Sequence, residues 1–355
     1  MTEKKPKVSI HKIPDFTIED FKKSSFDIRT PLHKCLDEIG WKEIVKEGAS
    51  ITVKVNGTHY EYLPGLTTNP ELIFEYVSLL RDRAREVVVG ESDLQRCSGD
   101  LALDGAGIRQ AAEKAGAKVV NFSKEKHLEV DICGEVLKKF SMPKSLVECD
   151  VFSSMPLFKT HKLTRVTVGL KNQFGCITDD NRLVYHGKIH KVLADINAFL
   201  KPKIIVTDGI IGLEGDGPIA GIPRKLGLLQ VSTNIVANDA CAAYIMGFEP
   251  SEILHIKYAA TRGLGTIDLS QIEFTNLKPD EVRQKFEPPP ADDFISKMER
   301  AVSGYPRLSK FIYKTMFKPA KYIAWKIRGG SGYKKRYVER IKATGLWDNY
   351  EGLFR

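Results

Sequence analysis

Strand-like and helix-like stretches alternate along most of the chain, and this order limits the possible folds more than any other feature. Residues 51–56, ITVKVN, alternate in polarity as a strand does, and residues 70–86 carry apolar side chains at helical spacing. Residues 86–92, EVVVGES, then have the apolar composition of a buried strand. Helical crossovers join strands that run in one direction, so the order predicts an α/β fold. We expect a mostly parallel sheet with flanking helices, Rossmann-like in style.

The same alternation continues further along the chain. Residues 107–115 predict a helix that ends at Gly116, and residues 118–121 predict the strand that follows it. The other predicted elements are strands at 149–156, 165–172 and 203–209, a loop at 157–164, and helices at 190–200 and 234–247.

The chain of 355 residues is long enough for two α/β lobes of ordinary size. We place the first lobe at residues 49–149 and the second, with the glycine-rich loops, at residues 150–286. Residues 1–48 form an N-terminal extension. The triple proline at 288–290 marks a linker, which opens a basic helical extension at residues 287–355.

Positive charge is concentrated in this C-terminal extension. From residue 291 onwards there are 15 Lys/Arg and 6 Asp/Glu, whereas the first 290 residues hold 39 of each kind. Residues 306–328 interleave lysines with aromatic and aliphatic side chains, which is typical of a basic amphipathic helix. Such a helix can pack its aromatic face on the body, or it can dock on a partner or lie on a membrane surface. Nucleic acid is the least expected partner.

The composition favours a cytoplasmic protein. No apolar run approaches the roughly 20 residues that span a bilayer, and no apolar segment follows the N-terminal lysines as in a secretory signal. The cysteines are scattered singly, so we expect free thiols and no iron–sulfur cluster of the chain's own. They are Cys35, Cys97, Cys133, Cys149, Cys176 and Cys241.

Residues 156–175 contain the densest group of chemically capable side chains. Lysines beside a strand end and a glycine turn suit a phosphate or carboxylate, because ammonium groups supply charge and free backbone N–H groups supply donors. His161 can transfer a proton near neutral pH. We therefore predict Lys159, His161 and Lys171 as catalytic residues. The predicted binding residues of this stretch are Asn172 and Gly175.

A second group lies in the glycine-rich stretch at residues 206–223. Asp208 follows a predicted strand, and ligands of open α/β sheets lie at the carboxyl ends of strands. We predict Asp208 and Glu214 as the opposing bases or metal ligands. The alternative is a long turn in which the carboxylates face water. The predicted binding residues of this stretch are Gly215 and Gly217.

Polar side chains also follow the predicted strands of the first lobe. They are Lys54, Asn56, Thr67, Thr68, Asn69, Glu91 and Ser92, and we predict that they bind substrate or cofactor. Separately, His186 and His190 are four residues apart, which brings two side chains together on a helix to share a metal ion. Gly187 between them weakens this metal prediction. No Walker, dinucleotide-binding, GxSxG, HExxH or kinase signature is present.

These strings in combination resemble the domain of unknown function 362 family, over roughly residues 51–268. The matching strings are VKVN, PGLTTNPELI, VVVGES, PLFKTHKLTRVTVGLKNQFG and IVTDGIIGLEGDGPIAG, followed by a helix with Asn238 and Asp239. Some members of that family carry a ferredoxin-like segment with clustered cysteines, which this chain lacks. The strand-end loops are also distantly similar to the lactate racemase type of α/β enzyme. The resemblance adds Asp239 to the predicted binding residues.

Three functions stay open from the sequence. The leading hypothesis is an enzyme that binds a small anionic substrate or nucleotide-like cofactor at the strand ends and performs acid–base or redox-linked chemistry. The second is a non-catalytic redox or assembly factor whose basic tail docks an iron–sulfur partner protein. The third is a metal-handling protein that binds a divalent metal through His161, His186, His190 and Asp208.

Overall fold

The computed structural model describes residues 5–14, 26–94, 97–178 and 182–291, with a few single residues further on. The elements of the first half are β1 (Lys7–Lys12), α2 (Arg29–Ile39), α3 (Trp41–Ile44), β2 (Ser50–Lys54), α4 (Pro70–Arg81), β3 (Glu86–Glu91), α5 (Gly99–Gly105), α6 (Ile108–Lys114), β4 (Lys118–Asn121), β5 (His127–Asp131), β6 (Lys139–Pro143) and α7 (Lys144–Glu148).

The second half adds both strands and helices. The strands are β7 (Val151–Ser154), β8 (Leu157–His161), β9 (Arg165–Thr167), β10 (Ile204–Glu214), β11 (Ile222–Ser232) and β12 (Glu273–Phe274). The α-helices are α8 (Gly169–Asn172), α9 (Ile189–Leu200), α10 (Ile235–Ile245) and α11 (Leu254–Thr261). The 3-10 helices are η1 (Gln173–Cys176), η2 (Arg182–Lys188), η3 (Pro250–Glu252), η4 (Leu269–Gln271) and η5 (Pro279–Val282).

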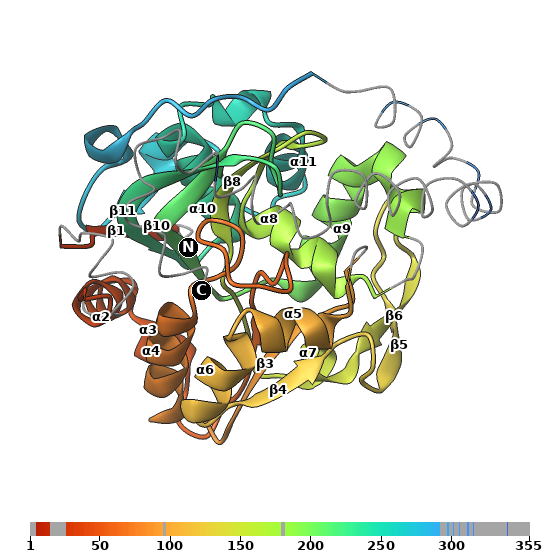
Figure 1. Ribbon diagram of the computed structural model, residues 1–355, viewed down its shortest axis with the longest axis horizontal. Coiled ribbons are helices and arrows are strands. Elements are labelled where there is room, and N and C mark those ends of the chain that lie inside the picture. The colour runs from red at the N-terminus through yellow and green to blue at the C-terminus, as the bar shows by residue number, and fades with distance from the viewer. Residues whose placement is uncertain are drawn as a thin grey trace.

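One ten-stranded sheet organises the molecule, with helices packed around it (Figure 1). Its order is β12-β1-β11-β10-β7-β2-β3-β4, and β8 pairs with both β10 and β9. The strands from β10 through β7, β2 and β3 to β4 pair in parallel, whereas β11 pairs antiparallel with β10 and β1. The prediction of an α/β fold with a mostly parallel sheet and flanking helices is confirmed.

Alternating side chains along the strands supply cores on both faces of the sheet. Ile204 and Val206 of β10 join Val53 of β2 in a core that also contains buried side chains of α2, α4 and α6. Ile205 joins Val236 and other side chains of α10 and α11 in a second core. Helices therefore cover both faces, as expected for a largely parallel sheet.

The glycine-rich stretch is a strand, and the alternative of a long turn over residues 206–223 is wrong for most of it. β10 continues to Glu214 and pairs with β11, with an irregularity between Gly209 and Ile211. A Cβ at Gly209 would lie 2.6 Å from Leu228 Cδ1, and one at Gly212 would lie 2.9 Å from the Phe158 carbonyl oxygen. These glycines permit close packing within a sheet, so their number misled the prediction.

The stretch that contains most of the predicted catalytic residues also differs from the prediction. Residues 157–161 form β8 rather than a loop, because they pair with β10 on one side and β9 on the other. The strand predicted at 165–172 ends at Thr167, and the chain then turns into the short helix α8. Lys171 consequently projects from a helix and not from a strand.

The sheet is continuous across the boundary predicted at residue 150, since β7 pairs with β2 on one side and β10 on the other. The predicted N-terminal extension contributes β1 to the same sheet. Within the described part of the chain, no helix is long and apolar enough to cross a membrane. All six cysteines are free thiols. The predicted basic tail lies, apart from a few single residues, outside the described residues.

Candidate functional site

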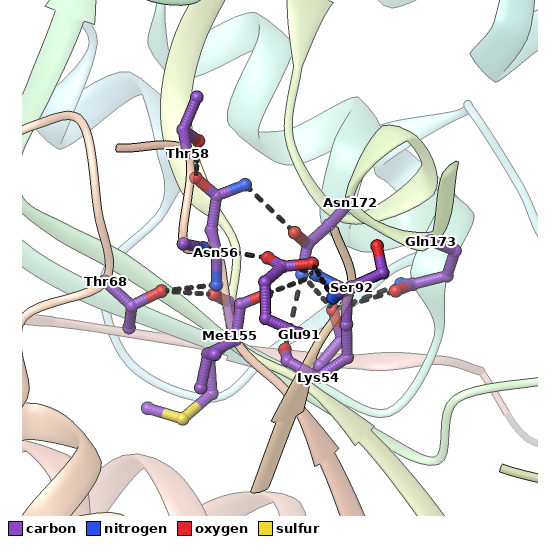
Figure 2. A network of polar contacts seen from close by, with 12 residues as sticks. Lys54, Asn56, Thr58, Thr68, Glu91, Ser92, Met155, Asn172 and Gln173 are labelled. Atoms are coloured by element: carbon purple, nitrogen blue, oxygen red, sulfur yellow. Dashed lines mark hydrogen bonds and ion pairs between the residues drawn. The ribbon is translucent and has the colours of Figure 1, made fainter. Parts of the chain in front are cut away.

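The strand ends of the first lobe meet the residues around α8 in a buried network of polar contacts (Figure 2). Lys54 Nζ lies 2.7 Å from Glu91 Oε2 and also donates to the Val55 carbonyl at 2.6 Å. The same carboxylate accepts from the backbone N–H of Gly57 at 2.8 Å and of Ser92 at 2.8 Å. The Lys54 and Glu91 side chains are only 1% and 3% exposed. The ion pair is therefore excluded from solvent, and backbone groups hydrogen-bond to both the ammonium and the carboxylate.

Two asparagines extend this network towards Lys159. Asn56 Nδ2 donates to Asn172 Oδ1 at 3.0 Å, and Asn172 Nδ2 donates to Ser154 Oγ at 3.0 Å. Lys159 Nζ donates to Asn56 Oδ1, Thr58 Oγ1 and the Leu66 carbonyl at 2.7, 3.1 and 3.0 Å. All three ammonium protons of Lys159 are thus used. We call the group of Lys54, Asn56, Glu91, Lys159 and Asn172 the polar network.

Burial and neighbouring charges strongly change the pKa of Lys159. Burial lowers the pKa of its ammonium to about 7, and the nearby charge of Lys171 lowers it further. The carboxylate of Asp208 acts in the opposite direction. Burial also raises the pKa of Asp208 to about 6, although its oxygens accept from the backbone N–H of Asn69 and Ile210 at 2.9 and 3.0 Å.

The other predicted residues of the first lobe have mainly structural contacts. Thr68 Oγ1 donates to the Met155 carbonyl at 2.8 Å, and Asn69 caps α4 through the N–H groups of its first turn. The Thr67 hydroxyl is buried, and no residue of the described chain hydrogen-bonds to it. Ser92 Oγ accepts from Arg182 Nη2 at 2.8 Å.

The predicted residues of the glycine-rich stretch also have local partners. Glu214 Oε2 lies 2.9 Å from Arg224 Nη1 and accepts from the Glu287 N–H at 3.0 Å. The Gly215 carbonyl accepts from Thr160 Oγ1, and a Cβ at Gly217 would lie 2.0 Å from the Thr160 carbonyl oxygen. Similarly, a Cβ at Gly175 would lie 2.8 Å from Lys54 Cε. Because they lack a side chain, Gly217 and Gly175 allow the Thr160 backbone and the Lys54 side chain, respectively, to approach closely.

Lys171 differs from all of these residues. Within the described chain its ammonium makes no hydrogen bond and no ion pair, and its recorded contact is the Phe174 ring, whose centroid is 4.9 Å away. Burial lowers the pKa of Lys171 to about 8, and the positive charge of Arg182 adds to this effect. A largely buried ammonium without a counter-ion is costly, and a bound anion would remove that cost.

His161 faces the same region from the end of β8. Its Nδ1 accepts the Leu163 backbone N–H at 3.0 Å, so the neutral ring carries its proton on Nε2. Burial lowers the pKa of His161 well below its usual range, and the next largest causes are the charges of Lys171 and His186. His161 is therefore a neutral donor at pH 7, beside a lysine that lacks a partner in the described chain.

A third histidine, His255 of α11, completes the group. It is fully buried, and neither of its ring nitrogens has a hydrogen-bond partner among the described residues. Its ring stacks on His190 with centroids 6.2 Å apart. Burial lowers the pKa of His255 well below its usual range, followed by the charges of His190 and Lys171. We call the group of His161, Lys171, His190 and His255 the cationic cluster.

The predicted histidine pair does not share one helix. His186 lies in η2, whereas His190 lies in the first turn of α9. No three histidine, cysteine, aspartate or glutamate side chains of the described ranges come close enough together to hold a metal ion. The prediction that His186 and His190 hold a divalent metal stays a prediction.

Asp239 lies behind the cluster and fixes α8. Its carboxylate accepts the backbone N–H groups of Gly169 and Leu170 at 2.8 and 2.9 Å, and Asn238 Nδ2 donates to it at 3.1 Å. Burial raises the pKa of Asp239 to about 7 although these donors lower it. Asp239, predicted to bind substrate or cofactor, here anchors the helix that carries Lys171.

The sequence prediction missed His255 and Arg182. His255 is a single histidine in the helical stretch ILHIKYAA, with no motif around it. A signal comes only from the fold, because α11 packs against α9 and α9 packs against α8 (Figure 1). This packing brings His255 near Lys171, although the two residues lie far apart in the sequence.

Comparison with known proteins gives one family, one protein of similar sequence and one solved structure of weak similarity. The family model described as domain of unknown function (DUF362) matches residues 51–244, more than half of the chain. Thylakoid-associated protein sll1697 of Synechocystis sp. is 24% identical over 226 residues, covering 60% of this chain and 68% of that protein. The lactate racemase apoprotein from Thermoanaerobacterium thermosaccharolyticum shares 10% identity at a TM-score of 0.38. That match covers 62% of this chain and 50% of the racemase chain.

Proposed function

We propose that this chain, which belongs to the domain of unknown function 362 family, is an enzyme that binds a small anionic substrate at the cationic cluster and acts on it by proton transfer. The observation that carries the proposal is Lys171, a largely buried ammonium without a counter-ion in the described chain. Natural proteins pair buried charges with partners, so a largely buried cation without one in the described chain indicates a ligand.

The neighbouring groups suit proton transfer near neutral pH. Burial and Arg182 bring the pKa of Lys171 to about 8, so a minor fraction is neutral at pH 7 and can accept a proton. His161 presents Nε2–H as a donor, because Leu163 holds its other nitrogen. One group can therefore hold an anionic oxygen while the other gives or takes a proton.

Binding is tested first, with inorganic phosphate and acetate as probes in isothermal titration calorimetry at pH 7. The protein should bind at least one of these anions at one site per chain. Lys171→Met should weaken that affinity by about 10- to 100-fold, the range expected for a charged hydrogen bond. Lys42→Met is the matched control, because Lys42 is an exposed lysine of α3 that pairs with Asp37.

Catalysis is tested once a natural ligand is known. Native mass spectrometry of freshly purified protein identifies any organic anion that stays bound, and that compound then serves as the candidate substrate. Turnover should fall by at least 100-fold in Lys171→Met and should be unchanged in Lys42→Met. Equal turnover in a folded Lys171→Met protein would contradict the catalytic role of Lys171.

A further inference from the structure

We infer that Phe174 is a positioning residue of the anion site, because its ring holds the ammonium of Lys171 by a cation–π contact and leaves the positive charge available to the substrate anion. The inference rests on the proposed function and adds a residue to the same site. Three observations support it: the place of the ammonium over the ring, the anchored backbone around Lys171, and the engagement of the Asp239 carboxylate with backbone groups.

The ammonium of Lys171 lies over the face of the Phe174 ring, with Nζ 4.9 Å from the ring centroid. A cation within about 6 Å of an aromatic face is attracted by the partial negative charge of that face. The pKa of Lys171 is lowered by burial to about 8, so most of the group is still protonated at pH 7 and meets the ring as a cation. The two residues are three positions apart in sequence, a spacing that brings side chains together along a helix.

The ring of Phe174 is held in place by the apolar core behind it. Its side chain is 8% exposed and belongs to a core that also contains Ile189 and Leu193 of α9. The ring of His186 lies on another side, with the two centroids 6.1 Å apart. Protein cores are packed closely, so the ring cannot turn away from the ammonium without disturbing its neighbours.

Amide side chains anchor the backbone on which Lys171 and the ring are carried. Asn172 Nδ2 and Gln173 Nε2 both donate to Ser154 Oγ, at 3.0 and 3.1 Å (Figure 2). Gln173 Nε2 also donates to the Gly169 carbonyl at 2.9 Å. These contacts tie α8 and η1 to each other and to the end of β7. Since the backbone is held, the side chain of Lys171 keeps most of the remaining freedom, and the ring restricts it.

An aromatic face holds a cation differently from a carboxylate. A carboxylate beside Lys171 would cancel its charge and compete with an incoming anion, as Glu91 cancels the charge of Lys54. A phenyl ring has no net charge, so it orients the ammonium and the charge stays available. Asp239, which lies at the start of α8, accepts the first two N–H groups of that helix instead. The segment therefore orients Lys171 without neutralising it.

Fluorinated phenylalanine tests the contact, because fluorine withdraws charge from the face of the ring and changes its size little. Trifluorophenylalanine in place of Phe174, in the full chain, should lower the pKa of Lys171 by about 0.5 to 1 pH unit. NMR titration of isotope-labelled lysine side chains measures this pKa, with Lys171→Met used for assignment. At pH 8 the affinity for sulfate, measured by calorimetry, should fall about two- to fivefold, since fewer ammonium groups stay charged.

Phe122 provides the matched control, because it lies in the same core as Phe174 and packs against Gly90. Trifluorophenylalanine in place of Phe122 should leave the pKa of Lys171 and the sulfate affinity unchanged. A second measurement on the unmodified chain needs no variant to fold. The ring current of Phe174 should shift the ε-CH2 protons of Lys171 upfield of those of Lys124, an exposed lysine that pairs with Asp100. Equal shifts would overturn the contact.

The outcomes separate this inference from the proposed function. If sulfate binds but the replaced ring changes neither the pKa of Lys171 nor the affinity, the inference fails and the anion site stands. A lowered pKa with unchanged sulfate affinity also overturns it, since the contact then has no part in binding. If the unmodified chain binds none of sulfate, phosphate and acetate, the proposed function fails, and the positioning role fails with it. A lowered pKa and weaker sulfate binding, both absent from the Phe122 control, support the inference.

Discussion

The polar network and the cationic cluster lie side by side and both contain lysines, yet the contacts of those lysines are opposite. In the network, Lys54 and Lys159 are buried and donate to two and three acceptors, respectively. In the cluster, the partly buried Lys171 and the fully buried His255 have none in the described chain. Lys54, Lys159 and Lys171 were all predicted as site residues, because each belongs to a polar group at or beside a predicted strand end. The difference shows that a strand-end position alone does not distinguish a structural lysine from one that binds ligand.

The two regions should therefore respond differently to the same substitution. Removing a lysine from the network leaves a buried carboxylate or amide without its partner, which costs stability. Removing a lysine from the cluster leaves no unpaired protein group, because none was paired to it. Substitutions in the network should therefore change the free energy of unfolding, and substitutions in the cluster should change the affinity for anions.

Lys54→Met is expected to have the largest effect on stability. It leaves Glu91 charged and buried, and breaking a buried ion pair costs about 3–5 kcal/mol. Urea unfolding followed by circular dichroism measures the loss. The double variant Lys54→Met/Glu91→Gln should recover at least half of it. A loss below about 1 kcal/mol would remove the distinction between the two regions.

Asp239→Asn should affect both regions at once. The amide can accept only one of the two N–H groups at the start of α8, so one buried donor loses its acceptor, at a cost of about 1–3 kcal/mol. Because α8 carries Lys171, anion affinity should also fall several-fold. Calorimetry with sulfate and urea unfolding measure the two effects. A stability loss with unchanged sulfate affinity would show that Asp239 does not position Lys171.

His255→Gln should change how stability depends on pH. The pKa of His255 lies well below its unfolded value of about 6.5, so the unfolded chain binds more protons in acid. As the pH falls below 6.5, the wild-type protein should lose stability relative to the variant, by up to about 1.4 kcal/mol per pH unit. Urea unfolding of both proteins at pH 7.5, 6.5 and 5.5 gives the difference, and parallel curves would contradict the buried state of this ring.

Lys171→Met should have the smallest effect on stability. The substitution replaces a cation that has no partner among the described residues with an apolar side chain of similar length, so we expect stability to rise by about 1 kcal/mol or less. The same urea unfolding experiment measures it beside Lys54→Met. A loss of more than about 2 kcal/mol would indicate that Lys171 has a structural partner and belongs to the network.

The sequence predicted the fold class better than the details of the site. Periodicity and glycine positions sufficed for β4 and for the start of α4, because local side chains determine those elements. The strand predicted at residues 203–209 was too short, and the loop expected beyond it is strand as far as Glu214, since its glycines pack against β11 and Phe158, which lie elsewhere in the chain. Asp239 was predicted to bind ligand, but its partner N–H groups become visible only when α8 and α10 pack together.

His255 shows the limit of the sequence most clearly. Its importance lies in having no hydrogen-bond partner within the described ranges, and the partners of a buried side chain depend on the helices that the fold brings together. Lys171 was predicted from its place in a dense group of polar residues, but nothing in the sequence separates it from Lys159. Only the count of hydrogen bonds on each ammonium makes that distinction.

The most direct test of the anion site is a crystal structure of the full chain soaked in selenate, a doubly charged anion located by its anomalous scattering. The account predicts a strong anomalous peak with selenate oxygens within hydrogen-bond distance of Lys171 Nζ, and with His161 and His255 beside it. Anomalous peaks confined to exposed lysines and arginines at the surface, with none at Lys171, would contradict it.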